Sequence, residues 1–505
     1  MRNAPVPLQS RRLPLRPLAA CLATLLAGSA LAAGAAETPL GGMAEPLRLE
    51  RPRWPTPLQP TTPHAPQDIV VTNCFDSGAG SLRDAIDNAA TGDTIDLTQL
   101  QCSTITLSTG AIIFGQDQLA IHGPGRHALR IEGGATANDG LLVHLGFGTL
   151  IVQDVTLANG HKYRSDTNAL GGCIHSEGNV ILRDSTVTGC KAQSEINHGA
   201  LGGGIWTGGS THLYTSEVSG NEAYAHGNGY ASGGGVYGLG GFFSQSSLIT
   251  GNRAHSPSST PSFGGGVFAR GYGGVFQTAI VGNQSARMGG LALADNGTSN
   301  AFIFQSTIST NQATRIGGVY VRRPLYLYNS TIANNHSAVS IAGASGSESA
   351  GLHMGVNVLT FHSNILADNY ADDVGRHDLG GEPGMLNTGT FNLITGTPIP
   401  PPPDTIGFTP ALGPLQDNGG PTPTHALIRG ESYAIDAGGL PPAGTFQFDQ
   451  RGTGFTRWAG SQVDIGALET DPDRIFTTGH DFGLPQPTAA MARRSGSGGA
   501  HARAD

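Results

Sequence analysis

One short pattern recurs seven times between residues 171 and 370 of this chain. Each copy has two small residues and an aliphatic residue, followed by a second aliphatic residue and a turn; the two aliphatic residues lie 13 residues apart in five of the seven copies. The first aliphatic residues are Ile174, Ile205, Val236, Val267, Leu291, Val319 and Leu352. They lie 31, 31, 31, 24, 28 and 33 residues apart, which is too long for a hairpin and suits one complete coil of a β-solenoid.

Turn residues recur in step with the aliphatic residues. They form one column of Cys190, Asn221, Asn252, Asn283, Asn311, Asn335 and Asn369. Asparagine tolerates left-handed turns, and its side-chain amide can bond the coil above it. Similar coils stacked about 4.8 Å apart bury their aliphatic residues in columns. Because crossovers between parallel strands are right-handed, the repeat predicts an all-β, right-handed, single-stranded parallel β-helix.

The N-terminus has the three-part layout of a secretory signal. Three arginines between residues 11 and 16 precede a mostly apolar run at 18–26, and Ala30-Leu31-Ala32 follows as a cleavage site. Residues 1–32 therefore predict a signal peptide cleaved near Ala32, and a mature chain that is secreted or held on the outer cell surface. No later stretch of about 18 apolar residues follows, so we expect no transmembrane segment.

Composition agrees with this fold class and narrows the partners. The chain has 76 glycines, 13% charged residues and 6% aromatic residues, as a turn-dense β-solenoid would. Its net charge of −9 disfavours nucleic acid as a partner. We expect a monomer whose partners are polysaccharide or other cell-surface components.

Four segments follow the predicted signal peptide. Residues 33–67 are rich in proline and predict an extended linker. Residues 68–370 form the predicted β-helix, 371–470 form C-terminal coils and a cap, and 471–505 have the composition of a disordered tail. Ser81-Leu82-Arg83-Asp84 begins a short amphipathic stretch, where we expect a helix that caps the open N-terminal end of the solenoid.

The expected mature chain keeps four cysteines: Cys74, Cys102, Cys173 and Cys190. An even number suits the oxidising compartment of an exported protein. Cys173 opens the first regular coil and Cys190 stands in its turn column, so a bridge between them could staple that coil. Of three possible connectivities we favour Cys74–Cys102 with Cys173–Cys190. A zinc site is the weaker alternative, since no Cys-x-x-Cys pair or histidine cluster accompanies the cysteines.

Four motifs follow the regular coils: Gly-Pro-Leu-Gln-Asp-Asn-Gly-Gly-Pro-Thr at 413–422, Ala-Ile-Asp-Ala-Gly at 434–438, Asp-Gln-Arg-Gly at 449–452 and Asp-Ile-Gly-Ala-Leu-Glu at 464–469. In this order they resemble motifs of secreted bacterial β-helix proteins of the choice-of-anchor Q type. Residues 80–86 are similar to the Cys-Ser-Leu-Arg-Glu-Ala motif that begins many such proteins, although Gly80 stands where that motif has cysteine. The resemblance covers residues 70–470 and implies export and a β-helix, but no agreed reaction. We see no C-terminal sorting helix with a basic end, so the means of anchoring stays open.

Polysaccharide lyases and hydrolases use this fold class, so an enzyme is one interpretation. Their sites need paired carboxylates, or acids on adjacent coils that hold calcium beside a base. The acids of the regular coils do not fall into one register column: Glu177, Asp184, Glu217, Glu222 and Asp295. We therefore assign no catalytic residue and favour an exported non-enzymatic protein with a structural or adhesive role. A polysaccharide lyase or hydrolase of the pectate-lyase-like class is the alternative.

The residue after the first aliphatic carries a ring in six of the seven coils: His175, Trp206, Tyr237, Phe268, Tyr320 and His353. Strand alternation places this column on the outside of the wall if the aliphatic points inward. Its rings could stack on sugar rings, with Arg322 supplying polar contacts nearby. Two plainer interpretations stay open. The rings could stabilise one another as cross-strand pairs, each contributing roughly 0.2 to 1 kcal/mol, or an insertion loop could cover them.

Charged residues outside this column have two further interpretations. Asp436, Asp449, Asp464 and Glu469 of the C-terminal motifs recur beside Arg451 and predict a structural, salt-bridged cap. A calcium site is the alternative there, because oxygen-rich loops suit that ion. No other metal and no organic cofactor is predicted. The adjacent pair Arg322-Arg323 is typical of solvated charge on the wall.

Overall fold

The computed structural model describes residues 65–135, 137–257, 260–295, 299–339, 342–343, 346–347, 349–355, 358–381, 386–439 and 446–471. All of them belong to one unit of the chain, Leu58–Asp505. The predicted signal peptide, most of the predicted linker and the predicted tail beyond residue 471 lie outside the described residues.

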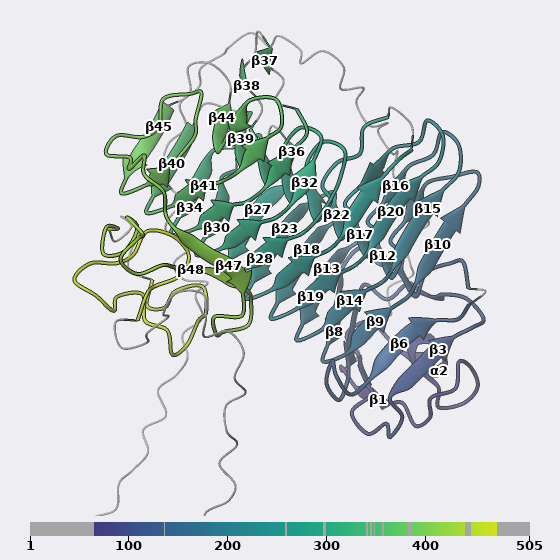
Figure 1. Ribbon diagram of the computed structural model, residues 1–505. Helices are drawn as coiled ribbons and strands as arrows, with labels where there is room; N and C mark the ends of the chain where they lie inside the picture. Colours follow the sequence, from purple (N-terminus) through teal and green to yellow (C-terminus); the bar gives the residue numbers. More distant parts are fainter. Residues whose placement is uncertain are drawn as a thin grey trace, which may run out of the picture. The chain divides into compact units, whose positions relative to one another are not determined.

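The described chain is a parallel β-solenoid with three long sheets (Figure 1). Sheet A contains β1 (Asp68–Val70), β2 (Thr94–Asp96), β5 (Gln118–His122), β8 (Thr149–Gln153), β13 (Asn179–Arg183), β18 (Ser210–Tyr214), β23 (Gly241–Gln245), β27 (Tyr272–Phe276), β30 (Ala301–Phe304), β34 (Leu325–Tyr328), β40 (Val358–His362) and β45 (Leu386–Thr390). Sheet B contains β3 (Thr104–Leu107), β6 (Arg130–Gly133), β9 (Thr156–Ala158), β14 (Thr186–Thr188), β19 (Glu217–Ser219), β24 (Leu248–Thr250), β28 (Ala279–Val281), β31 (Thr307–Ser309), β35 (Thr331–Ala333), β41 (Ile365–Ala367) and β46 (Leu393–Ile394).

Sheet C closes the coil. It contains β4 (Ile112–Phe114), β7 (Leu142–His144), β12 (Ile174–Ser176), β17 (Ile205–Thr207), β22 (Val236–Gly238), β26 (Val267–Ala269), β29 (Leu291–Leu293), β33 (Val319–Val321), β39 (Leu352–Met354) and β44 (Leu379–Gly381). The short strands β38 (Gly346–Ser347) and β37 (Ala342–Gly343) extend it by antiparallel pairing.

Shorter strands line the return segments between sheets B and C. One set is β10 (His161–Arg164), β15 (Lys191–Ser194), β20 (Glu222–Ala225) and β25 (Arg253–His255). The others are β11 (Ala169–Leu170), β16 (Ala200–Leu201) and β21 (Ala231–Ser232), then β32 (Gln312–Ala313), β36 (His336–Ser337), β42 (Tyr370–Ala371) and β43 (Gly375–Arg376). A hairpin of β47 (Leu412–Gln416) and β48 (Thr424–Leu427) begins the C-terminal segment.

Successive coils stack in the register that the repeat predicts. Ile174 pairs with Ile205, and Ile205 pairs with Val236. The second aliphatic residues pair in the same way, as in Val187 with Val218. Both columns are fully buried in one continuous apolar core. The predicted parallel β-solenoid is therefore confirmed, while its right-handed turn stays a prediction.

The asparagine column is a continuous hydrogen-bonded ladder. Each asparagine donates from Nδ2 to Oδ1 of the next, at 2.9 Å between Asn221 and Asn252 and at 2.8 Å between Asn335 and Asn369. The ladder begins at Cys190, whose backbone N–H donates to Oδ1 of Asn221. It ends at Asp378, whose Oδ1 accepts both the backbone N–H and Nδ2 of Asn369. The ladder thus satisfies amides that are buried inside the turn.

A second ladder lies at the corner between sheets A and B. The backbone N–H of each rung donates to the side-chain oxygen of the next, at 3.2 Å from Ser185 to Ser216 and at 3.1 Å from Ser216 to Ser247. Its members are Ser185, Ser216, Ser247, Thr278, Ser306, Ser330, Asn364 and Asn392. The first seven stand two residues before the second aliphatic of their coil, a regular offset that could have revealed them in the sequence.

The N-terminal end carries α2 (Leu82–Asn88), the one helix among the described residues. Its N-cap Ser81 accepts a hydrogen bond from the backbone N–H of Asp84 at 3.2 Å. Leu82, Ala85 and Ile86 pack into the main core. The expected helix is confirmed, whereas its function as a cap stays a prediction.

Both favoured disulfides are present. Cys74 is bonded to Cys102 and Cys173 to Cys190, with Cα atoms 6.5 and 5.5 Å apart. The zinc alternative is wrong, because all four sulfur atoms are used in bridges. The second bridge ties the start of the first regular coil to the origin of the asparagine ladder.

Candidate functional site

The predicted ring column does lie on the outer face of sheet C. His175 pairs with Trp206, Trp206 with Tyr237, and Tyr237 with Phe268. The aliphatic residues before them face the main core, as alternation predicts. His175 meets Trp206 edge to face, and Tyr237 stacks on Phe268 with 5.2 Å between their ring centroids.

Apart from His175, the rings of this column are nevertheless buried. Trp206, Tyr237, Phe268 and Tyr320 form a second apolar cluster with residues from the return segments. Those residues are Leu201, Met288 and Ile316, with Leu170, Tyr230 and Phe263 at the margin of the cluster. Leu239 and Ala294, which follow strands of sheet C, also lie at its margin. The plainer interpretation, in which a neighbouring segment covers the rings, agrees with this packing. Sugar stacking on this column stays a prediction, and the burial of its rings weighs against it.

Both ends of the column are histidines, and they differ in exposure. His175 is partly exposed, and its Nε2 lies 3.0 Å from Oε1 of Glu177. His353 is buried and stacks on Tyr320, with ring centroids 5.7 Å apart. Burial raises the pKa of Tyr237, in the middle of the column, so its hydroxyl stays protonated.

The arginine pair beside this column is not simply solvated charge. Arg323 is buried and donates to the carbonyl oxygens of Ser299 at 3.2 Å and Arg270 at 3.3 Å. It also lies 3.4 Å from the carboxylate of Asp295. The prediction of a solvated pair is therefore wrong for Arg323, because its guanidinium holds the loops at the corner between sheets C and A. Arg322 is partly buried.

A different set of rings occupies the outer face of sheet A. One column contains His212, Phe243, Phe302 and Tyr326, and its neighbour contains Tyr214, Phe276 and Phe304. All seven are partly exposed, and we call them the sheet A wall. Ring centroids are 5.3 Å apart between Phe243 and Phe276 and 5.5 Å apart between Phe302 and Tyr326. The repeat does not predict this wall, because its rings begin only at β18 and are interrupted at Gly274 and Gln245.

Polar groups accompany the rings of the sheet A wall. Nε2 of His212 lies 2.9 Å from the hydroxyl of Tyr272, which is exposed. Burial lowers the pKa of His212, which favours its neutral form. Gly274 stands in the first column where the neighbouring coils carry rings. A Cβ atom at this position would lie 3.0 Å from the ring of Phe276 and 3.1 Å from that of Phe243, so these rings already fill the space. The wall therefore presents partly exposed rings, tyrosine hydroxyls and one imidazole to the outside.

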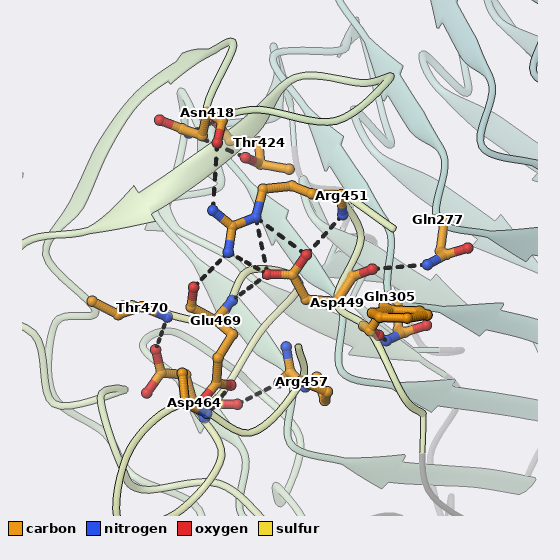
Figure 2. A network of polar contacts seen from close by, with 12 residues as sticks. Gln277, Gln305, Asn418, Thr424, Asp449, Arg451, Arg457, Asp464, Glu469 and Thr470 are labelled. Atoms are coloured by element: carbon orange, nitrogen blue, oxygen red, sulfur yellow. Dashed lines mark hydrogen bonds and ion pairs between the residues drawn. The ribbon is translucent and has the colours of Figure 1, made fainter. Parts of the chain in front are cut away.

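The C-terminal motifs meet in a buried polar network (Figure 2). Arg451 donates from Nη2 to Oδ2 of Asp449 at 2.6 Å and to the carbonyl oxygen of Glu469 at 2.6 Å. Both side chains of the Asp449–Arg451 pair are almost fully buried. The guanidinium also lies over the ring of Phe455, 4.1 Å from its centroid. The motifs thus supply both the charge and the groups that compensate it.

The other predicted acids accept backbone N–H groups of the same segment. Oδ1 of Asp464 accepts from Asp436 at 2.8 Å, and Oδ2 accepts from Thr470 at 2.6 Å. Oε2 of Glu469 accepts from the backbone of Asp464 at 2.9 Å. Burial raises the pKa of Asp464, and it raises that of Glu469 to about 7 although Arg457 lies nearby.

The calcium alternative receives no support from this geometry. Asp436, Asp449, Asp464 and Glu469 do lie in one region, but N–H donors already occupy their oxygens. Within the described ranges, no group of three or more histidines, cysteines or acids could hold a metal ion. A calcium site stays a prediction that the donors weigh against.

The same segment binds the outer face of sheet B. Thr307 donates to Oε1 of Gln450 at 2.6 Å, and the hydroxyl of Ser309 lies 2.9 Å from Nε2 of His425. Thr331 accepts the backbone N–H of Ala467 at 3.1 Å. Burial lowers the pKa of His425, so its neutral form fits this contact. These hydroxyls were not predicted to be functional, since only the folded chain shows what they contact.

Comparisons with known proteins leave the family open. No protein-family model matches the chain. A search of curated proteins likewise finds no significant match. Among the described residues, none of the helical structure has the length and apolar character needed to span a bilayer.

Proposed function

We propose that this protein is an exported, non-enzymatic β-solenoid with a structural or adhesive role, which contacts polysaccharide along its outer surface. The observation that carries the proposal is the sheet A wall, a run of partly exposed rings over consecutive coils. Contiguous exposed apolar surface marks interaction sites more often than scattered rings do. Ring edges beside the hydroxyls of Tyr272 and Tyr326 match the mixed apolar and hydroxyl surface of a sugar chain.

The use of the buried acids also supports a structural role. Asp378 terminates the asparagine ladder, and Asp449 pairs with Arg451 in the C-terminal network. Strongly shifted pKa values often mark catalytic groups, but buried structural networks shift them as well. Burial raises the pKa of Asp378 to about 6 at a position where its oxygens already accept from Asn369 and Thr395.

Export and the choice-of-anchor Q resemblance belong to the same proposal. The leader at residues 1–32 predicts secretion, and two disulfides fit an oxidising compartment. A polysaccharide lyase remains the competing function, because the parallel solenoid is compatible with one.

The test uses the expected mature chain, residues 33–505, with acidic and neutral polysaccharides, with and without calcium. Pull-down measures binding, and ultraviolet absorbance measures the unsaturated products of a lyase. We expect retention without new absorbance. Phe243→Ala and Tyr326→Ala should reduce retention, whereas Tyr370→Ala, which removes an exposed ring of β42, should not. Growing absorbance would replace the proposal with a lyase, and unchanged retention of both wall variants would remove the sheet A wall from it.

A further inference from the structure

Two contacting rings that are both more than half exposed lie on the C-terminal segment and not on the sheet A wall. The rings of the wall are only partly exposed. Phe302 stacks on Tyr326 at an interplanar angle of 15°, whereas Phe276 and Phe304 meet edge to face at 87°. Phe408 and Tyr433 also stack, with centroids 4.9 Å apart, yet they remain 63% and 56% exposed. A pair of this kind presents a broad apolar surface to solvent.

Buried neighbours hold both rings in place. Ile406, two residues before Phe408, forms a parallel bridge with Leu393 of β46. Ala434, next to Tyr433, is fully buried, and its carbonyl oxygen accepts the backbone N–H of Ile465 at 2.8 Å. Each ring therefore projects from backbone that is tied to the apolar cluster under the C-terminal segment. A rigid, exposed pair loses little conformational entropy when a ligand binds.

Charge near the pair disfavours an acidic ligand. The exposed acids Asp404 and Glu431 flank the two rings in the sequence. The one nearby cation in the sequence, Arg429, donates to the carbonyl oxygen of Asp471 at 2.7 Å. With a net charge of −9 on the chain, a uronic-acid polymer would be repelled more than a neutral one.

We infer that the Phe408–Tyr433 pair is a stacking site for a neutral sugar ring of a polysaccharide. This inference rests on the proposed function and deepens it, because it adds a second contact outside the sheet A wall and names the class of sugar. The pair takes the apolar face of the sugar ring.

The experiment measures retention of the mature chain on microcrystalline cellulose, insoluble mannan and polygalacturonate coupled to agarose. Wild type should be retained on at least one neutral polymer. Phe408→Ala and Tyr433→Ala should weaken that retention at least tenfold, while Tyr433→Phe, which keeps the ring, should retain most of it. Phe75→Ala is the matched control, since that ring is 73% exposed and lies near the other end of the described chain.

The outcomes separate this inference from the proposal beneath it. Unchanged retention of Phe408→Ala and Tyr433→Ala, with loss in Tyr326→Ala, would overturn the stacking site and leave the sheet A wall intact. Retention on polygalacturonate alone would overturn the neutral class. If wild type binds none of the polymers, the polysaccharide part of the proposed function falls together with the inference. Melting temperatures equal to wild type ensure that each variant is folded.

Discussion

Sheet B has the same interior from end to end but two different exteriors. Inside, one aliphatic residue per strand joins the core, both in β14, β19 and β24 and in β28, β31 and β35. Outside, the three earlier strands alternate between partly exposed and buried residues, whereas every residue of the three later strands is buried. The C-terminal segment covers the later strands (Figure 1), whose outer residues are Ala279, Val281, Thr307, Ser309, Thr331 and Ala333.

This contrast separates two kinds of contact, those between neighbouring coils and those between a coil and a second layer. The inner aliphatic pattern specifies that coils stack, and it is the same in both regions. The outer residues of the earlier coils meet solvent, whereas those of the later coils meet a second layer, the C-terminal segment. Mutations of inner groups should therefore act alike in both regions, and mutations of outer groups should act only in the later coils.

Arg451→Ala should have the largest effect. It leaves the carboxylate of Asp449 buried without its partner, and loss of one member of a buried pair destabilises by about 3 to 5 kcal/mol. We expect the C-terminal segment to detach first, so hydrogen exchange should rise in β28, β31 and β35 while β14 stays protected. Arg253→Ala is the control, because that side chain is 46% exposed and 4.0 Å from Glu222. Equal exchange in early and late strands would contradict the two-layer account.

Asparagine substitutions in the ladder should have the next largest effect on stability, and the effect should be the same in early and late coils. Asn252→Ala in an early coil and Asn335→Ala in a late one each orphan buried amide groups of the neighbouring rungs. Each should lower the unfolding free energy by about 1 to 3 kcal/mol, measured by denaturant titration. A loss confined to one of the two coils would show that the interior is not uniform.

A pH effect of intermediate size should come from Asp378. Burial raises its pKa from 3.8 to about 6, so between these values the folded chain binds this proton more tightly than the unfolded chain. The unfolding free energy should therefore fall as pH rises from 4 to 7, and Asp378→Asn should flatten that slope. If the Asp378→Asn variant keeps the slope of the wild type, Asp378 is not the source of that slope.

The opposite pH dependence should come from Asp76 at the N-terminal end. Burial alone would raise the pKa of Asp76, but hydrogen bonds from Arg83, Ser108 and Thr109 lower it to about 2. The stabilisation that ionised Asp76 provides should disappear only as pH falls below about 4 toward 2.

The smallest predicted difference is in the unfolding free energy lost when two matched threonines of sheet B are each replaced by valine. Thr331→Val removes the acceptor for the buried backbone N–H of Ala467 and should lower the unfolding free energy by about 1 kcal/mol. Thr186→Val, in the same column on β14, changes a partly exposed residue and should stay within about 0.5 kcal/mol of wild type. Comparable losses in a thermal scan would mean that the C-terminal segment contributes little at this contact.

Inner features were predictable because they repeat. The aliphatic columns, the asparagine ladder and the disulfide between Cys173 and Cys190 all follow from offsets within one coil. The ladder from Ser185 to Asn364 has an equally regular offset, so the signal was present although a hydroxyl is a weaker marker than an amide. Periodicity therefore predicts the packing and hydrogen bonds between neighbouring coils.

Outer features were harder to predict because their environment comes from elsewhere in the chain. Alternation put Trp206 outside sheet C correctly, but its burial depends on Leu201 and other residues of the return segments. In the same way, Thr307 reads as a solvent-facing residue until Gln450, 143 positions later, is placed against it. Contacts over such separations have no signature in a repeat.

The asparagine ladder has a direction, and it ends at a residue that only accepts hydrogen bonds. Each rung passes a donor onward, so any rung can receive another coil. Ionised Asp378 takes two donors from Asn369 and has none to hand on. The ladder therefore ends at this turn, although one further strand in each long sheet, β44, β45 and β46, still pairs with the coil before it.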